Sequence, residues 1–439
     1  MNKKIFNLTI LTFIFVLTIF SAGCDSDSAD EEGEKKSSGL SLPSDYVQTV
    51  KPLNEKVAVD VYFDATVSMR GYTTLAAGNV YRTLPDILTD VGSSMGEVKF
   101  YKFGAEIKLL ENRDHRKFSS PDPYVEVITA VQNVVDSADT SHLSIIVTDL
   151  FESDSDWSSI SRKIREKYFA NHLAVAVVGI KNSFEGEIFD VGLNAAKFHY
   201  TSYDYPYKFR PFYMLVMGNE TAIERFLEKF KERQTLPNET KYLLLSENLA
   251  TESNDFSSLP ILDLQNFFND NRLDIADNSI KEFGLDKFSS PASYTVQFDY
   301  KPQFGACPLN FNEIVNEVKV FYLEENEWQA MNSNDVKIDI KPLEGKENSF
   351  AVTLTLTPER TLKEGRLNFI HAALTPSEKG YLLPEWVRAW NMPNVDVDAA
   401  NFEGSKTINL IHVIGSMKDS VFAVARPTIV NMNFLIDAR

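Results

Sequence analysis

The sequence predicts an α/β fold with a doubly wound, mainly parallel sheet, followed by a β-rich, sandwich-like C-terminal domain. The first observation is a series of strands that are apolar throughout, such as SHLSIIVTDL and LAVAVVGI, separated by amphipathic helical segments. The second is a change of the hydrophobic period to two from Ser293 onward. A chain of 439 residues is also too long for one ordinary core, so two or three domains are expected.

The N-terminus has the layout of a secretory signal. Two lysines precede the apolar run IFNLTILTFIFVLTIF, and the small residues SAG lead directly to Cys24. The tetrapeptide SAGC resembles the lipobox of bacterial lipoproteins, in which the cysteine becomes the lipidated first residue of the mature chain. The resemblance implies a signal peptide at residues 1–23 and a lipid anchor at Cys24, on the extracytoplasmic face of a bacterial cell membrane. An uncleaved membrane anchor or a plain signal peptide is the alternative.

A polar segment without apolar period follows Cys24, and we predict a disordered tether over residues 24–45. Cys307 is the second of the two cysteines, so lipidation of Cys24 leaves no intramolecular disulfide. Cys307 is therefore expected to be a small buried hydrophobic residue.

Strands and helices then alternate over a predicted α/β domain at residues 46–246. Strands are expected at VAVDVYFD, EVKFYKFGAEIKLL, SHLSIIVTDL and LAVAVVGI, the second as a strand or hairpin. Helices are expected at VYRTLPDILTDVGSSM, PDPYVEVITAVQNVVDSA and SDWSSISRKIREKYFANH. The segments RPFYMLVMG, ETAIERFLEKFKER and KYLLLS continue this order, so residues 201–246 either extend the first sheet or form a subdomain. Ligands of such sheets bind at the carboxyl ends of the strands, where Asp64 and Asp149 fall.

The C-terminal part begins after a predicted connector at residues 247–291, which is rich in Asn, Asp and Ser. A β-rich domain is predicted at residues 292–439, with strands at SYTVQFDY, NEVKVFYLE, VKIDIKP, NSFAVTLTLTP and GRLNFIHAALTP. One helical segment, TINLIHVIGSMKDSVF, precedes a final strand at TIVNMNFLI.

Charge and motifs exclude several functions. The formal net charge is −18, whereas nucleic-acid binding requires a basic surface, so no nucleic-acid partner is expected. The six histidines show no zinc-binding spacing. The sequence also contains no GxxxxGK[ST] phosphate loop and no GxGxxG fingerprint.

Three oxygen side chains, those of Asp64, Thr66 and Ser68, alternate in the turn that follows the strand VAVDVYFD. Alternate residues of such a turn can point the same way, so one carboxylate and two hydroxyls can converge on a hard cation such as Mg²⁺. The alternative is that these residues cap the start of a helix.

The stretch FDATVSMRGY resembles the first loop of a von Willebrand factor A (vWA) domain, whose metal-ion-dependent adhesion site (MIDAS) carries Asp-x-Ser-x-Ser after its first strand. The family's second acidic residue follows a later apolar strand, and IIVTDLFESD places Asp149 at the matching position. The resemblance covers roughly residues 56–200 and implies a vWA/Rossmann-like fold. Three departures occur: Thr66 stands in place of the first serine, Ser119 or Ser120 would have to substitute for a loop threonine, and Leu150 replaces a glycine.

The resemblance also implies a mechanism. Thr66 and Ser68 would coordinate Mg²⁺ directly, with Mn²⁺ as a second choice, and Asp64, Asp149 and Ser120 would complete the metal site. An Asp or Glu carboxylate of a protein partner would fill the open position. We therefore expect Mg²⁺-dependent protein binding, adhesion or envelope complex assembly rather than catalysis. The alternatives are a metal-dependent phosphate or sulfate ester hydrolase with Thr66 as nucleophile, and a scaffold lipoprotein with a degenerate metal site.

Overall fold

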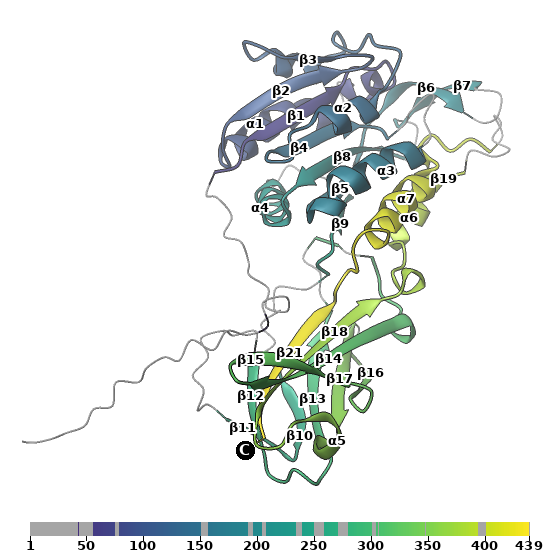
Figure 1. Cartoon of the computed structure of the whole chain (residues 1–439). Helices are drawn as coiled ribbons and strands as arrows, with labels where there is room; N and C mark the ends of the chain where they lie inside the picture. Colours follow the sequence, from purple (N-terminus) through teal and green to yellow (C-terminus); the bar gives the residue numbers. More distant parts are fainter. Residues whose placement is uncertain are drawn as a thin grey trace, which may run out of the picture. The chain divides into compact units, whose positions relative to one another are not determined.

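A seven-stranded sheet carries the first half of the chain, in the order β3-β2-β1-β4-β8-β5-β9 (Figure 1). The computed structural model describes residues 43, 56–74, 79–150, 157–191, 196–203, 208–233, 239–249, 259–270, 280–300, 304–305, 307–346, 348–393 and 401–438. The predicted signal peptide and Cys24 lie outside these residues. The strands of the sheet are β1 (Val59–Asp64), β2 (Val98–Phe103), β3 (Ile107–Leu109), β4 (Leu143–Thr148), β5 (Ala174–Asn182), β8 (Arg210–Gly218) and β9 (Thr240–Leu245).

The prediction of a doubly wound, mainly parallel sheet of vWA/Rossmann type is wrong. Only β2, β1 and β4 are parallel neighbours, whereas β3, β8, β5 and β9 pair antiparallel with their neighbours. The reason lies between β5 and β8, where the antiparallel pair β6 (Glu185–Val191) and β7 (Ala196–Thr201) stands in place of a helical crossover. The chain therefore returns beside β5 in the opposite direction, and the structure is a mixed, strand-rich α/β fold.

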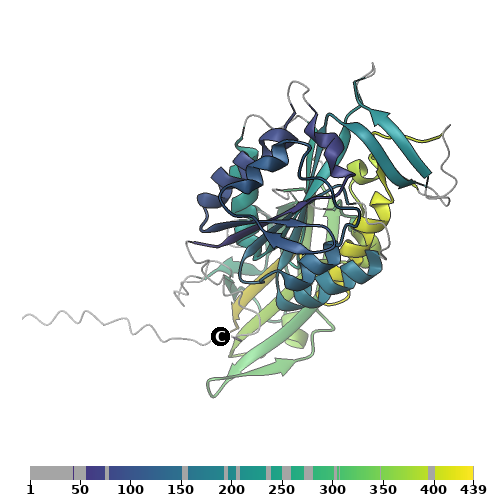
Figure 2. The same cartoon turned by 90° about the horizontal axis from the view of Figure 1, so that it is seen from above.

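Helices cover both faces of this sheet (Figure 2). Val59, Val61 and Phe63 of β1 are buried in one apolar cluster with residues of α1 and α4, whereas Tyr62 belongs to a second cluster with residues of α2 and α3. This alternation is the side-chain period of a strand that is covered on both sides. The four helices are α1 (Leu84–Ser93), α2 (Val131–Ser137), α3 (Trp157–Lys167) and α4 (Glu220–Lys231).

The C-terminal strands lie in two further sheets, of order β10-β13-β17-β16 and β11-β12-β21-β18-β14-β15. All neighbours are antiparallel except β12 and β21. Inward-facing residues of both sheets share one apolar cluster, in which the rings of Tyr294 and Phe434 lie 5.4 Å apart. The strands are β10 (Ile261–Gln265), β11 (Phe267–Asn269), β12 (Ile280–Leu285), β13 (Ala292–Asp299), β14 (Ile314–Glu324), β15 (Glu327–Met331), β16 (Lys337–Pro342), β17 (Ser349–Leu356), β18 (Leu367–Pro376) and β21 (Val430–Asp437). The predicted connector thus contributes β10, β11 and β12 to these sheets.

Elements from the C-terminal half also contact the first sheet. The Ser420 hydroxyl of α7 donates to the carbonyl of Ser161 in α3 at 3.2 Å, and the hydroxyls of Tyr213 and Thr407 lie 2.8 Å apart. Within the described part of the chain, no helix combines the length and apolar character needed to cross a bilayer. Cys307 is buried with a free thiol, as expected from the sequence. The remaining elements are α5 (Pro358–Thr361), α6 (Glu385–Ala389), α7 (Leu410–Phe422), β19 (Asn391–Met392) and β20 (Thr407–Ile408).

We expect Gly71→Ala to destabilise the fold by about 1–3 kcal/mol, because a Cβ atom there would overlap the ring of Phe184, which is itself buried. Gly415→Ala is the matched control. A Cβ atom at Gly415, within α7, meets only Leu383 at 4.0 Å, so this variant should be neutral or more stable by up to about 1 kcal/mol. Urea unfolding of both variants measures the difference, and equal unfolding free energies would contradict the close contact.

Candidate functional site

Two aspartates follow the ends of neighbouring parallel strands. β1 and β4 pair with Phe63 opposite Val147, so Asp64 and Asp149 leave the sheet at the same edge. Asp64 is fully buried, and Asp149 is 3% exposed. The carboxyl ends of parallel strands are where α/β sheets hold ligands, so this edge is the place to look for a functional site.

The turn after β1 brings three oxygen side chains together. The Oδ1 atom of Asp64 accepts hydrogen bonds from the Thr66 backbone N–H at 3.0 Å and from the Thr66 hydroxyl at 2.6 Å. The Thr66 hydroxyl also lies 3.0 Å from the Ser68 hydroxyl. Ser68 occupies the N-cap position of the 3₁₀ helix η1 (Met69–Thr73), yet its side chain makes no capping hydrogen bond. Helix capping therefore does not account for Ser68, whose hydroxyl turns toward Thr66.

Thr148 is a further member of this cluster, and the sequence analysis did not single it out. As the last residue of β4, it donates from its hydroxyl to Oδ2 of Asp64 at 2.9 Å and accepts from the Leu150 N–H at 3.3 Å. Both carboxylate oxygens of Asp64 are thus held by hydroxyls, one from each strand end. In the sequence, the feature that could have identified Thr148 is its position directly before Asp149, at the end of an apolar strand.

The electrostatics of this site favour a cation. Burial raises the pKa of Asp64 to about 7, and the negative charge of Asp149 raises this pKa as well. Hydrogen bonds from Thr66 and Thr148 act in the opposite direction. Two buried carboxylates resist ionising together, and a cation between them would offset both the desolvation cost and the repulsion.

The backbone turns sharply at Leu150, directly after Asp149. Its φ of 58° lies in the left-handed region, where a residue with a side chain costs about 1–2 kcal/mol more than in the right-handed one. Leu150 is 1% exposed and belongs to the apolar cluster that includes Trp157 and Ile160 of α3. Glycine would adopt this conformation without strain. In this chain the packing of the Leu150 side chain holds the strained turn in place, and strained backbone of this kind is frequent at functional sites.

The Ser120 hydroxyl is engaged outside the cluster. Ser120 ends the 3₁₀ helix η3 (Asp114–Ser119), and its hydroxyl donates to the carbonyl of Lys117 at 2.8 Å. In the described part of the chain, no hydrogen bond joins Ser120 to Asp64. The structure thus joins Asp64, Thr66 and Ser68 by hydrogen bonds and adds Thr148, whereas the Ser120 hydroxyl bonds to Lys117.

A different loop contacts the turn after β1. The Glu126 N–H donates to the carbonyl of Ala65 at 3.1 Å, and its carbonyl accepts from the Val67 N–H at 3.0 Å. Thr129 follows in the same loop, two residues before α2, and is 6% exposed. Thr129 is therefore a buried hydroxyl residue three positions after the residue that pairs with the turn. Its sequence signal was a threonine just before the helical segment VQNVVDS.

The donor set fits a small, hard cation. Its candidate members are the carboxylates of Asp64 and Asp149 and the hydroxyls of Thr66 and Ser68. Mg²⁺ prefers oxygen ligands and keeps several waters, so a few protein oxygens suffice to hold it. Among the described residues, no group of three or more His, Cys, Asp or Glu side chains is placed to hold a metal ion. Hydroxyl ligands would therefore have to complete a site here.

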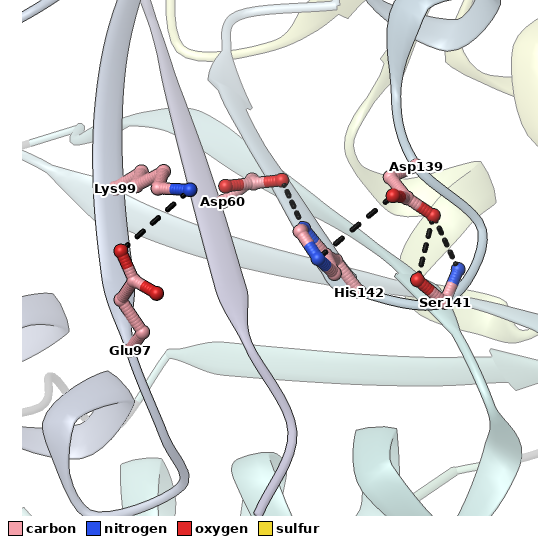
Figure 3. A network of polar contacts seen from close by, with 6 residues as sticks. All are labelled: Asp60, Glu97, Lys99, Asp139, Ser141 and His142. Atoms are coloured by element: carbon pink, nitrogen blue, oxygen red, sulfur yellow. Dashed lines mark hydrogen bonds and ion pairs between the residues drawn. The ribbon is translucent and has the colours of Figure 1, made fainter.

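A second polar network lies at the opposite end of β1 (Figure 3). His142 Nδ1 lies 2.7 Å from Oδ2 of Asp60, and its Nε2 lies 3.8 Å from Oδ2 of Asp139. The Ser141 hydroxyl donates to Oδ1 of Asp139 at 2.7 Å rather than to the imidazole. Serine and histidine are therefore not arranged as a nucleophile and its base, and the network instead joins the starts of β1 and β4.

Comparison with known protein families and with curated protein sequences finds no match for this chain. The resemblance to the vWA domain therefore rests on the two loop motifs, FDATVSMRGY and IIVTDLFESD. Of the second motif, the structure describes the residues up to Leu150.

In the metal-free chain, we expect the contribution of Asp64 to the free energy of unfolding to fall as the pH rises from about 4 to about 7. An unperturbed aspartate ionises near 3.8, whereas folded Asp64 keeps its proton up to a pKa of about 7, so the folded state binds more protons in this window. The stabilising contribution is complete below about pH 4 and lost above about pH 7. Asp64→Asn should flatten this slope in EDTA, as measured by urea unfolding across the pH range. Parallel profiles for the two proteins would contradict the raised pKa.

Proposed function

We propose that this chain is a membrane-anchored extracytoplasmic lipoprotein that binds a protein partner through Mg²⁺. Thr66 and Ser68 coordinate the ion directly, and Asp64 and Asp149 act directly or through water. An Asp or Glu carboxylate of the partner fills the open position, because a site with few charged ligands leaves Mg²⁺ short of electron density. Such binding serves adhesion or the assembly of an envelope complex.

One observation carries this proposal: hydroxyls and carboxylates converge at the ends of β1 and β4 in a buried setting. The hydroxyl of Thr66 lies within 3.0 Å of both Asp64 Oδ1 and Ser68 Oγ, and the charge of Asp149 acts on Asp64. A purely structural cluster would gain nothing from placing two acids together, because each raises the cost of ionising the other. The membrane anchor in the proposal rests on the SAGC motif at Cys24.

A hydrolase is the second candidate, favoured by the 2.6 Å hydrogen bond from the Thr66 hydroxyl to Asp64. A carboxylate whose pKa is about 7 can accept a proton from a nucleophile near neutral pH. Thr66 is only 2% exposed and Asp64 is fully buried, so an ester would have to displace the turn to reach them, as would a partner's carboxylate in the binding proposal. Release of p-nitrophenol from p-nitrophenyl phosphate or sulfate, lost in Thr66→Val, would favour this candidate over the binding protein.

We expect Mg²⁺ to raise the melting temperature of the unmodified protein and to have no effect on Asp64→Ala. A ligand that binds only the folded state stabilises it by about 2.7 kcal/mol when its free concentration is about 100 times Kd. Thr66→Val should weaken the effect, because it removes one ligand oxygen at constant shape. Differential scanning fluorimetry and calorimetric titration with Mg²⁺ and Mn²⁺ measure both quantities.

Asp60→Asn is the matched control for this experiment. Asp60 is likewise buried, at 5% exposure, and lies on the same strand, but it pairs with His142 at the opposite end. This variant should keep the Mg²⁺ response of the unmodified protein. If Mg²⁺ produces neither heat nor a melting shift in the unmodified protein, the scaffold with a degenerate site becomes the better description.

We expect Cys24→Ser to abolish incorporation of labelled palmitate and to release the protein from the membrane fraction, because a lipidated cysteine is the anchor in the proposal. Cys307→Ser, which changes the other cysteine, should remain labelled and membrane-bound. Metabolic labelling followed by fractionation measures both. A Cys24→Ser protein that stays in the membrane fraction would contradict lipid anchoring and favour an uncleaved apolar segment.

A further inference from the structure

Three large apolar side chains are exposed within four consecutive residues of the loop before α2. Val125 is 65% exposed, Val127 is 81% exposed and Ile128 is 49% exposed. Scattered exposed hydrophobic residues are normal on a protein surface, but adjacent ones form a patch that favours contact with another molecule. We refer to Val125, Val127 and Ile128 as the apolar loop patch.

The apolar loop patch lies directly beside the candidate metal site. Glu126, in its middle, forms a parallel β-bridge with Thr66, through hydrogen bonds to Ala65 and Val67. The same turn carries the Thr66 and Ser68 hydroxyls. The patch and the candidate metal site are thus joined through this backbone pairing.

The loop's own acid does not fill the open metal position. The Glu126 carboxylate lies 3.4 Å from the Lys102 ammonium group. Its side chain thus turns toward β2, and a carboxylate ligand has to come from outside the loop.

The backbone of the loop is available on its outer side. Glu126 directs its N–H and C=O groups toward Ala65 and Val67, so those of Val125 and Val127 point the other way. In the described part of the chain, the backbone groups of Val125 and Val127 form no hydrogen bonds. Backbone N–H and C=O groups without partners can pair with the backbone of a segment of another chain.

We propose that the partner presents an extended peptide segment in which an acidic residue is flanked by β-branched apolar residues. This inference rests on the proposed function: the acidic side chain completes the Mg²⁺ site, and the flanking side chains pack on the apolar loop patch. The metal provides the requirement for a carboxylate, which many proteins can meet. The patch provides the selectivity, because burial of apolar surface distinguishes valine from glycine on either side of the acid.

The test uses three acetylated peptide amides, Gly-Val-Asp-Val-Gly, Gly-Gly-Asp-Gly-Gly and Gly-Val-Asn-Val-Gly, titrated into the full chain in detergent with saturating Mg²⁺. The valine-flanked aspartate peptide should bind about tenfold more tightly than the glycine-flanked one, since two partly buried valines contribute a difference of that order. The asparagine peptide should not bind. EDTA should abolish binding of both aspartate peptides.

The double variant Val127→Ser, Ile128→Ser should lose the preference for valine while keeping the weaker affinity for the glycine-flanked peptide. Both side chains are exposed, so the fold should tolerate the change. Val315→Ser, at a residue of β14 that is 55% exposed, is the control for removing an exposed valine elsewhere and should keep the preference.

The outcomes separate this inference from the proposed function. Equal Mg²⁺-dependent binding of both aspartate peptides, or a valine preference that survives in the double variant, would overturn the inference and leave the metal site standing. No Mg²⁺-dependent binding of either aspartate peptide would overturn both. Self-association of the unmodified chain that the double variant abolishes would assign the patch to a second copy and also overturn the inference.

Discussion

The parallel pairing of β1 with β4 is the constraint on which the candidate site depends. The register that places Phe63 opposite Val147 carries Asp64 and Thr148 to one edge of the sheet, where their side chains bond at 2.9 Å. A shift of one residue would turn one of these side chains to the opposite face. Both strands are buried along their whole length, so packing on two faces holds the register.

Burial then gives the site its chemical character. The lone pairs of Asp64 are satisfied by neutral donors, Thr66 and Thr148, which hold the carboxylate without neutralising it. Asp149 adds a second acid whose charge acts on Asp64, and both acids are buried. Such a site has a reason to bind a cation even though the chain offers no cluster of three acids or histidines among its described residues.

The candidate site does not depend on the antiparallel pairing of β8, β5 and β9 in the rest of the sheet. β8 pairs antiparallel with the edge of β4 that faces away from β1. β2, β1 and β4 are nevertheless parallel to one another. The ends of β1 and β4 are all that the carboxylate and hydroxyl cluster requires. The apolar loop patch likewise depends on one local contact, the bridge between Glu126 and Thr66.

The amino-acid pattern alone was enough to place β1 and β4, to put Asp64 and Asp149 at strand ends, and to locate the oxygen side chains of the turn, because hydrophobic period and residue chemistry are local properties. It did not determine the direction of β8, since a strand buried on both faces shows no alternation that would reveal its neighbours.

The folded chain was needed to show that Thr148 reaches Asp64, that the Ser120 hydroxyl bonds to Lys117, and that Glu126 pairs with the turn. The first and last of these facts depend on hydrogen bonds between distant segments, such as the bond between Asp64 and Thr148, which are 84 residues apart. The strand register that sets those contacts comes from packing of the whole sheet, and no short stretch of sequence contains it.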